Sequence, residues 1–92
     1  MKKEAVDNVR SWIKTGQLDE CECWLKEELE KNPNDDELHF WMGNLKRHQN
    51  NWQEALQSYA TATELNAESP AREARMMLMD IVRFYDKQRY NV

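Results

Sequence analysis

Two cysteines and two histidines are the side chains of this sequence best suited to redox or metal chemistry. The cysteines lie in Cys21-Glu22-Cys23, and the histidines are His39 and His48. On a helix, residues two apart point to different sides, so the two sulfurs are expected to diverge. A tetrahedral zinc site needs four ligands, and the histidines add no recognised spacing to the cysteine pair. We therefore expect Cys21 to fill a small core position, with no metal and no cofactor. A thiol-redox or metal protein is therefore the weakest of the functional hypotheses for this chain.

Other patterns of catalysis are also missing from the sequence. It contains no Gly-rich phosphate-binding loop and no nucleophile elbow. Carboxylates are abundant, but we expect them on solvated helix faces, as in the acidic segment of residues 18–31, which includes Glu20, Glu22, Glu27, Glu28 and Glu30. The sequence therefore predicts a protein that is not an enzyme and has no catalytic residues.

Length and composition limit both the fold and the partner. The 92 residues make one small domain, with 40% apolar residues, 33% charged residues and only two Gly and two Pro. That balance favours amphipathic helices over strands and turns. A net charge of −4 argues against a general binder of nucleic acid or anionic membranes. No run approaches the roughly 18 apolar residues of a membrane-spanning helix, and the first residues lack the apolar core of a signal peptide. We expect a cytoplasmic protein.

Hydrophobic periodicity and boundary residues predict five helices. Gly16 allows the left-handed geometry that closes a helix. Ser69 followed by Pro70 is a strong helix start, with the serine as N-cap and the proline at the first helical position. The last helix carries an apolar stripe of Ala74, Met77, Leu78, Ile81 and Tyr85. The expected ranges are 2–15, 18–31, 36–48, 52–66 and 70–87.

Small and aromatic residues follow a defined spacing in the segment 36–69. Met42-Gly43 is followed by Ala55, twelve residues after the glycine, and by Tyr59 four residues later. The tetratricopeptide pattern places L-G, A-x3-F and P in the same order over about 34 residues. The segment therefore resembles one tetratricopeptide repeat. The resemblance implies two antiparallel helices whose backbones approach closely at Gly43 and Ala55.

A second, degenerate copy of the pattern precedes this segment. Moving the frame back by one repeat length gives residues 2–35, where Cys21 is the small residue opposite Val9. The resemblance thus covers residues 2–69, and residues 70–92 remain as a terminal helix over the last repeat. It implies a single all-α domain, 1–92: a right-handed α-α superhelix of two helix hairpins, 2–35 and 36–69, with a long C-terminal capping helix, 70–92. Three positions of the second repeat depart from the pattern: His39, Lys46 and Ala67.

The tail is similar to that of small, largely uncharacterised tetratricopeptide proteins from Bacteroidetes-type bacteria. The similarity rests on Ser69-Pro70-Ala71, Phe84-Tyr85-Asp86-Lys87 and Tyr90-Asn91, and on overall size. This similarity does not imply any catalysed reaction.

In this family, the first helix of each repeat and the capping helix line a concave groove that binds peptides. The resemblance therefore implies a non-catalytic protein-interaction module whose groove takes a peptide or a partner helix. Phe40 and Trp41 would anchor apolar groups, Asn44 would bond the peptide backbone, and the cations would pair with an acidic ligand. The projection also places Ala71 and Leu78 on this surface. The predicted groove residues are Arg10, Lys14, Phe40, Trp41, Asn44, Arg47 and Arg75. The alternative is that the aromatic pair packs between repeats and the cations are ordinary solvated helix ends.

The last helix suggests a second function. It has apolar residues on more sides than one packing partner would cover, and methionine-rich surfaces often bind adaptably. Two repeats and a cap are short for a solenoid, so burying a further helix face would add stability. The alternative function is therefore a self-assembling structural subunit, a homodimer or higher oligomer, that associates through Met76, Met79, Val82 and Phe84.

Overall fold

Five helices make up the computed structural model, which describes the backbone of residues 1–90 and the side chains of residues 1–84. They are α1 (Lys3–Thr15), α2 (Leu18–Lys31), α3 (Asp36–His48), α4 (Trp52–Leu65) and α5 (Ala71–Tyr90). Every boundary lies within one residue of its predicted position, except that α5 continues beyond residue 87 to Tyr90. The side chain of Tyr85 and the predicted end of the tail at residues 91–92 lie outside the described residues. In the described part of the chain, no helix is long and apolar enough to cross a membrane.

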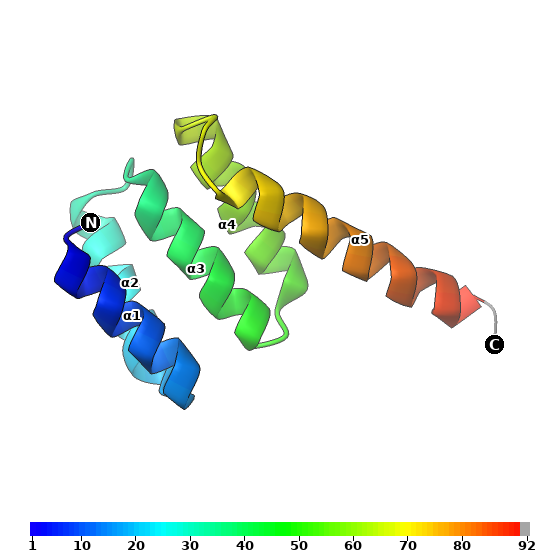
Figure 1. Cartoon of the computed structure of the whole chain (residues 1–92), viewed down its shortest axis with the longest axis horizontal. Coiled ribbons are helices and arrows are strands. Elements are labelled where there is room, and N and C mark those ends of the chain that lie inside the picture. The colour runs from blue at the N-terminus through cyan, green and yellow to red at the C-terminus, as the bar shows by residue number, and fades with distance from the viewer. Residues whose placement is uncertain (91–92) are drawn as a thin grey trace.

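The helices form an extended array rather than a ball (Figure 1). Its principal dimensions are 45 × 30 × 19 Å. Consecutive helices pack on one another, most extensively α3 on α4, and α1 also contacts α3. The C-terminal part of α5 extends beyond the other four helices (Figure 1). The predicted all-α helical array is thus confirmed, whereas its right-handed sense and the capping role of α5 stay predictions.

Local residues account for the helix ends. Gly16 follows α1 with a φ of 81°, the left-handed conformation that glycine adopts without a steric penalty. The N–H of Glu37 donates to Asp35 Oδ1 at 3.0 Å at the start of α3. The N–H of Ala71 donates to Ser69 Oγ at 3.2 Å at the start of α5. These contacts confirm the predicted turn at Gly16 and the predicted N-cap at Ser69.

Two apolar clusters hold the array together. The first joins α1, α2 and α3, and the second joins α4 and α5. Phe40 from α3 packs against the second cluster and so ties the two together. The buried members of the first cluster are Val9, Cys21, Leu25, Leu38, Met42 and Leu45; those of the second are Ala55, Tyr59, Ala62, Ala71 and Leu78.

Gly43 marks the closest approach of α3 and α4. A Cβ atom at this position would lie 2.5 Å from two ring carbons of Tyr59, which is closer than real Cβ contacts come. The Tyr59 side chain is completely buried, so its ring has no open space into which it could move. The close contact implied by the sequence pattern is therefore present, and it depends on the missing side chain of Gly43.

The variant Gly43→Ala is expected to lower the free energy of unfolding by about 1–3 kcal/mol through overpacking against Tyr59. The higher helix propensity of alanine, worth roughly 1 kcal/mol, offsets only part of that cost. Urea unfolding followed by far-UV circular dichroism measures the change. Ser11→Ala, on an exposed position of α1, is the matched control and should be nearly neutral. Unchanged stability of Gly43→Ala would contradict the contact.

Candidate functional site

A pocket of about 310 Å³ lies between α1 and α3. Residues about one helical turn apart have their side chains on the same face of a helix. Each of the two helices therefore contributes several side chains to the pocket. Of the seven predicted groove residues, the structure brings five together here, while Phe40 and Arg75 do not line the pocket. The lining residues are Arg10, Ile13 and Lys14 from α1, and Trp41, Asn44, Arg47 and His48 from α3.

Trp41 is held by its neighbours on several sides. The guanidinium carbon of Arg10 lies 5.6 Å from the centroid of the Trp41 ring, a cation–π contact. The Phe40 ring meets Trp41 edge-on, with centroids 5.3 Å apart and an interplanar angle of 69°. Trp41 is only partly buried and packs against the first apolar cluster. It therefore has a fixed orientation while part of its surface faces the pocket.

Asn44 is oriented from the α4 side. The hydroxyl of Tyr59 donates a short hydrogen bond to Asn44 Oδ1. Burial raises the pKa of Tyr59, so the phenol stays protonated and continues to donate. Because the amide oxygen is occupied, the amide N–H groups of Asn44 remain to donate to a ligand.

The pocket carries uncompensated positive charge. Arg10, Lys14 and Arg47 line it, and none of its lining residues is acidic. Among the residues that the structure describes, these three cations form no ion pair. A local excess of positive charge attracts anionic groups. In a chain with a net charge of −4, this pocket is therefore suited to an anionic ligand.

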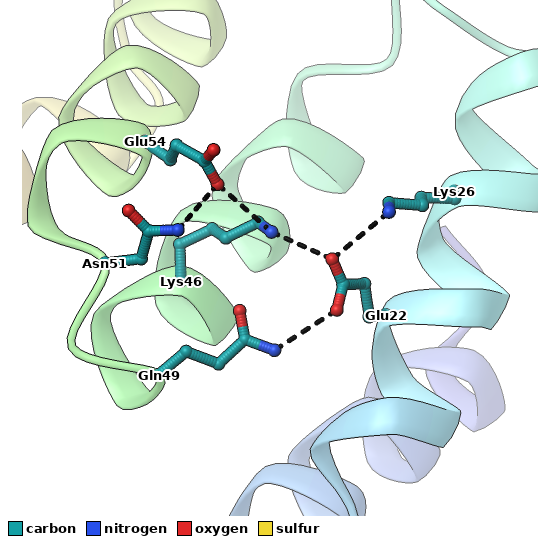
Figure 2. Close-up of polar contacts among 6 residues, drawn as sticks. All are labelled: Glu22, Lys26, Lys46, Gln49, Asn51 and Glu54. Carbon is teal, nitrogen blue, oxygen red and sulfur yellow. Dashed lines mark hydrogen bonds and ion pairs between the residues drawn. The ribbon is translucent and has the colours of Figure 1, made fainter.

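Lys46, the residue before Arg47, is paired with carboxylates of neighbouring helices (Figure 2). Its Nζ lies 2.8 Å from Glu22 Oε1 and 3.1 Å from Glu54 Oε2. Gln49 Nε2 also donates to Glu22 Oε2 at 3.2 Å. The lysine that replaces an aromatic residue of the repeat pattern thus links α2, α3 and α4 by charge.

The placement of Glu22 differs from the prediction of a solvated helix face. Its side chain is only 22% exposed, and it also pairs with Lys26 at 3.2 Å. The reason is the lysine at position 46, which requires a counter-charge from the neighbouring helix. The departure of Lys46 from the repeat pattern was the signal in the sequence for this network, although it did not identify the partner.

This network predicts a loss of stability in acid. Hydrogen bonds from Lys46 and then Gln49 lower the pKa of Glu22 from 4.5 to about 2. Because the folded-state pKa lies below the unfolded one, the stabilisation is present above about pH 4.5 and is lost as the pH falls towards 2. We expect Glu22 to contribute about 1–2 kcal/mol, since part of the network is exposed to water.

Urea unfolding between pH 2 and pH 6 measures this contribution in wild type and in Glu22→Gln. The variant should lose most of the slope of stability against pH in that window. Glu20→Gln, on an exposed position of the same helix, should retain it. Parallel curves for wild type and Glu22→Gln would contradict the assigned role.

Cys21 occupies the predicted core position. Cys21 is buried in the first apolar cluster and Cys23 is exposed, so the two sulfurs do diverge. Burial, followed by the charge of Glu22, raises the pKa of Cys21 to about 11, which leaves the thiol protonated and unreactive at neutral pH. His39 Nε2 lies 2.8 Å from the Pro33 carbonyl oxygen and secures the preceding loop. Among the described side chains, no group of three His, Cys, Asp or Glu residues is placed to hold a metal ion.

The described side chains of α5 divide into a buried stripe and an exposed face. Ala71 and Leu78 are buried against α4, although the sequence projection placed them on the groove. Met77, a member of the predicted apolar stripe, is 60% exposed. Both differences have one cause: α5 packs on α4 through Ala71, Ala74, Leu78 and Val82, one face of a helix.

The residues predicted for self-association lie on more than one side of α5. Met76 and Phe84 are each 58% exposed. Met79 is partly buried, and Val82 packs against the second apolar cluster. Among the described side chains of α5, the exposed apolar area is therefore centred on Met76, Met77 and Phe84 rather than on all four predicted residues.

Comparisons with known proteins agree with this architecture. A family model described as tetratricopeptide repeat matches residues 24–57, from α2 to α4. The solution NMR structure of Bacteroides fragilis protein BF1650 is similar to this structure, with a TM-score of 0.83 and 39% sequence identity, over 99% of this chain and 91% of that chain. No curated protein sequence matches the chain. Both predicted resemblances, to the family and to a Bacteroidetes protein, are confirmed, and the chain belongs to the tetratricopeptide repeat family.

Proposed function

We propose that this protein is a cytoplasmic, non-catalytic interaction module that binds an acidic segment of a partner protein in the pocket between α1 and α3. Tetratricopeptide repeats generally mediate protein–protein interaction, which supports a protein partner rather than nucleic acid or a membrane. The observation that carries the proposal is a set of three cations that line one pocket with the partly exposed ring of Trp41 and form no ion pair among the described residues. The working unit is the whole domain, with hairpins 2–35 and 36–69 and capping helix 70–92.

Each pocket residue has a distinct role in this proposal. Trp41 is the apolar anchor, and the cations Arg10, Lys14 and Arg47 pair with carboxylates of the segment. Asn44 donates its free amide hydrogens to a peptide carbonyl, because Tyr59 already occupies its oxygen. Aromatic anchors beside Arg residues are typical of the side chains that contribute most to binding.

Two predicted groove residues, Phe40 and Arg75, do not line the pocket. Phe40 supports the Trp41 ring edge-on instead of meeting the ligand. Arg75 is exposed on α5, outside the pocket. A ligand long enough to leave the pocket towards α5 would be needed to reach it.

Selection from a random peptide library on the immobilised protein tests the proposal. We expect the enriched peptides to carry acidic residues next to an aromatic or aliphatic one. The same peptides should not bind a Trp41→Ala variant. Enrichment of basic peptides, or equal binding to wild type and variant, would refute an acidic ligand in this pocket.

A second candidate function is self-association through α5. It is favoured by Met76 and Met77, neighbouring apolar side chains that are 58% and 60% exposed. Burying adjacent large apolar side chains is a common basis of homodimer interfaces. Size-exclusion chromatography with light scattering tests it. A dimer that a Met76→Glu, Met77→Glu variant converts to a monomer would support it, and a monomeric wild type at every concentration would exclude it.

A further inference from the structure

We infer that the pocket between α1 and α3 takes a doubly charged group, a phosphorylated side chain of the partner segment. The inference rests on the proposed function and specifies the chemistry of its ligand. It comes from the number, type and surroundings of the pocket cations, which match a phosphate better than a single carboxylate.

Charge balance is the first argument. The three cations Arg10, Lys14 and Arg47 face one pocket of about 310 Å³ without an acidic lining residue. A phosphorylated side chain carries a charge of about −1.5 to −2 at pH 7 and presents three acceptor oxygens. A carboxylate carries a single charge, so it would leave two of the three cations without an anion. A phosphate therefore neutralises more of the charge that the pocket concentrates.

The neighbouring Lys46 has a structural role, and carboxylates of the same chain balance its positive charge. Lys46 is only 14% exposed and pairs with both Glu22 and Glu54. Arg47, the next residue on α3, turns to the pocket and forms no ion pair within the described part of the chain. The Arg47 side chain interacts with the neutral hydroxyl of Tyr59, so among the described residues its positive charge has no anionic partner and can pair with an anionic ligand.

Geometry is the second argument. Two of the three cations are arginines, whose planar guanidinium groups match phosphate oxygens with paired hydrogen bonds. The contact with Trp41 holds Arg10 in place before any ligand arrives, which lowers the entropy cost of binding. Clusters of arginines are a recurring means of recognising phosphorylated peptide motifs. The Trp41 ring would then pack against the side chain that flanks the phosphorylated residue.

A matched set of short blocked peptides tests the inference. The peptides are identical, with leucines flanking one central position, and that position is phosphoserine, glutamate or serine. A fourth peptide carries two adjacent glutamates, so its charge matches the phosphopeptide. Affinities are measured by isothermal titration calorimetry, and the site is identified from the indole N–H signal of Trp41 in ¹H–¹⁵N NMR spectra. Inorganic phosphate alone is the final probe.

We expect the phosphopeptide to bind about tenfold or more tightly than either glutamate peptide, since phosphate forms paired bonds with both arginines. Arg10→Gln and Arg47→Gln should each remove that preference. Arg83→Gln, at an exposed cation of α5 outside the pocket, is the matched control and should preserve it. Circular dichroism confirms that each variant is folded.

The outcomes separate this inference from the proposed function. Equal affinity for phosphoserine and glutamate, with both lost in Arg47→Gln, would overturn the phosphate inference and leave an acidic-peptide module. Inorganic phosphate that binds as tightly as the phosphopeptide would overturn the assignment to a protein side chain. If no peptide shifts the Trp41 signal, both the inference and the proposed function are wrong.

Discussion

The variant Tyr59→Ala is expected to lower the free energy of unfolding by about 3–5 kcal/mol, the usual cost of deleting a buried aromatic ring. The side chain is completely buried, its ring lies against the backbone of Gly43, and its centroid is 6.1 Å from that of Phe40. Its loss would leave a cavity between α3 and α4, and would remove the donor to Asn44. Since small domains are stable by only about 5–15 kcal/mol, this variant should be near the threshold of unfolding.

Urea unfolding followed by circular dichroism measures the effect of Tyr59→Ala. Tyr59→Phe is the matched control because it keeps the ring and removes only the hydroxyl. It should cost about 1 kcal/mol, the typical net value of one hydrogen bond. A Tyr59→Ala variant as stable as Tyr59→Phe would mean that the ring is not the centre of the α3–α4 contact.

The variant Trp41→Ala is expected to weaken binding of a selected acidic peptide by about a hundredfold, in the range of 2–4 kcal/mol for a central anchor residue. The ring lines the pocket as an apolar surface beside Ile13, and it also orients the guanidinium of Arg10. Its truncation would therefore remove an apolar contact and loosen a cation at the same time. Isothermal titration calorimetry measures the change.

Trp41 also packs against the first apolar cluster, so loss of binding must be distinguished from loss of structure. Arg10→Glu is the second variant, because Arg10 is exposed on α1 and belongs to neither apolar cluster. It should reduce affinity about tenfold or more through charge repulsion while the thermal unfolding temperature changes little. Full affinity in both folded variants would contradict a ligand in this pocket.

Local signals made the helices predictable. Gly16 and Ser69 determine helix boundaries through the conformation or hydrogen bonding of a single residue, so neighbouring residues suffice to recognise them. The packing of Gly43 on Tyr59 was implied by a family pattern whose spacing reflects the contact itself. The repeat frame also assigned Arg10, Trp41 and their pocket neighbours to one surface, because it specifies which face of each helix lines the groove.

Contacts between distant residues were harder to predict. Glu22 and Lys46 belong to different hairpins, and helical periodicity gives no information about which carboxylate meets which lysine. The pattern has an aromatic residue where Lys46 stands, so the mismatch was visible but its compensation was not. The bond from Tyr59 to Asn44 also depends on how two helices are rotated against each other.

The sequence did not predict which face of the last helix packs on the rest of the domain. Apolar residues lie on several sides of α5, so more than one stripe satisfies helical spacing. Packing on α4 selects the face with Ala71 and Leu78, which leaves Met77 exposed. Arg75 consequently lies outside the pocket, although the repeat frame had placed it in the groove.

The central claim is that the pocket between α1 and α3 is the surface that recognises a partner. Affinity purification from the native lysate tests it most directly, comparing wild type with a Trp41→Ala, Arg47→Glu variant and with an Arg83→Glu control by quantitative mass spectrometry. We expect a set of proteins that is retained by wild type and control and is lost with the pocket variant. Identical protein lists from all three baits, or recovery of the bait alone, would contradict it and direct attention to α5.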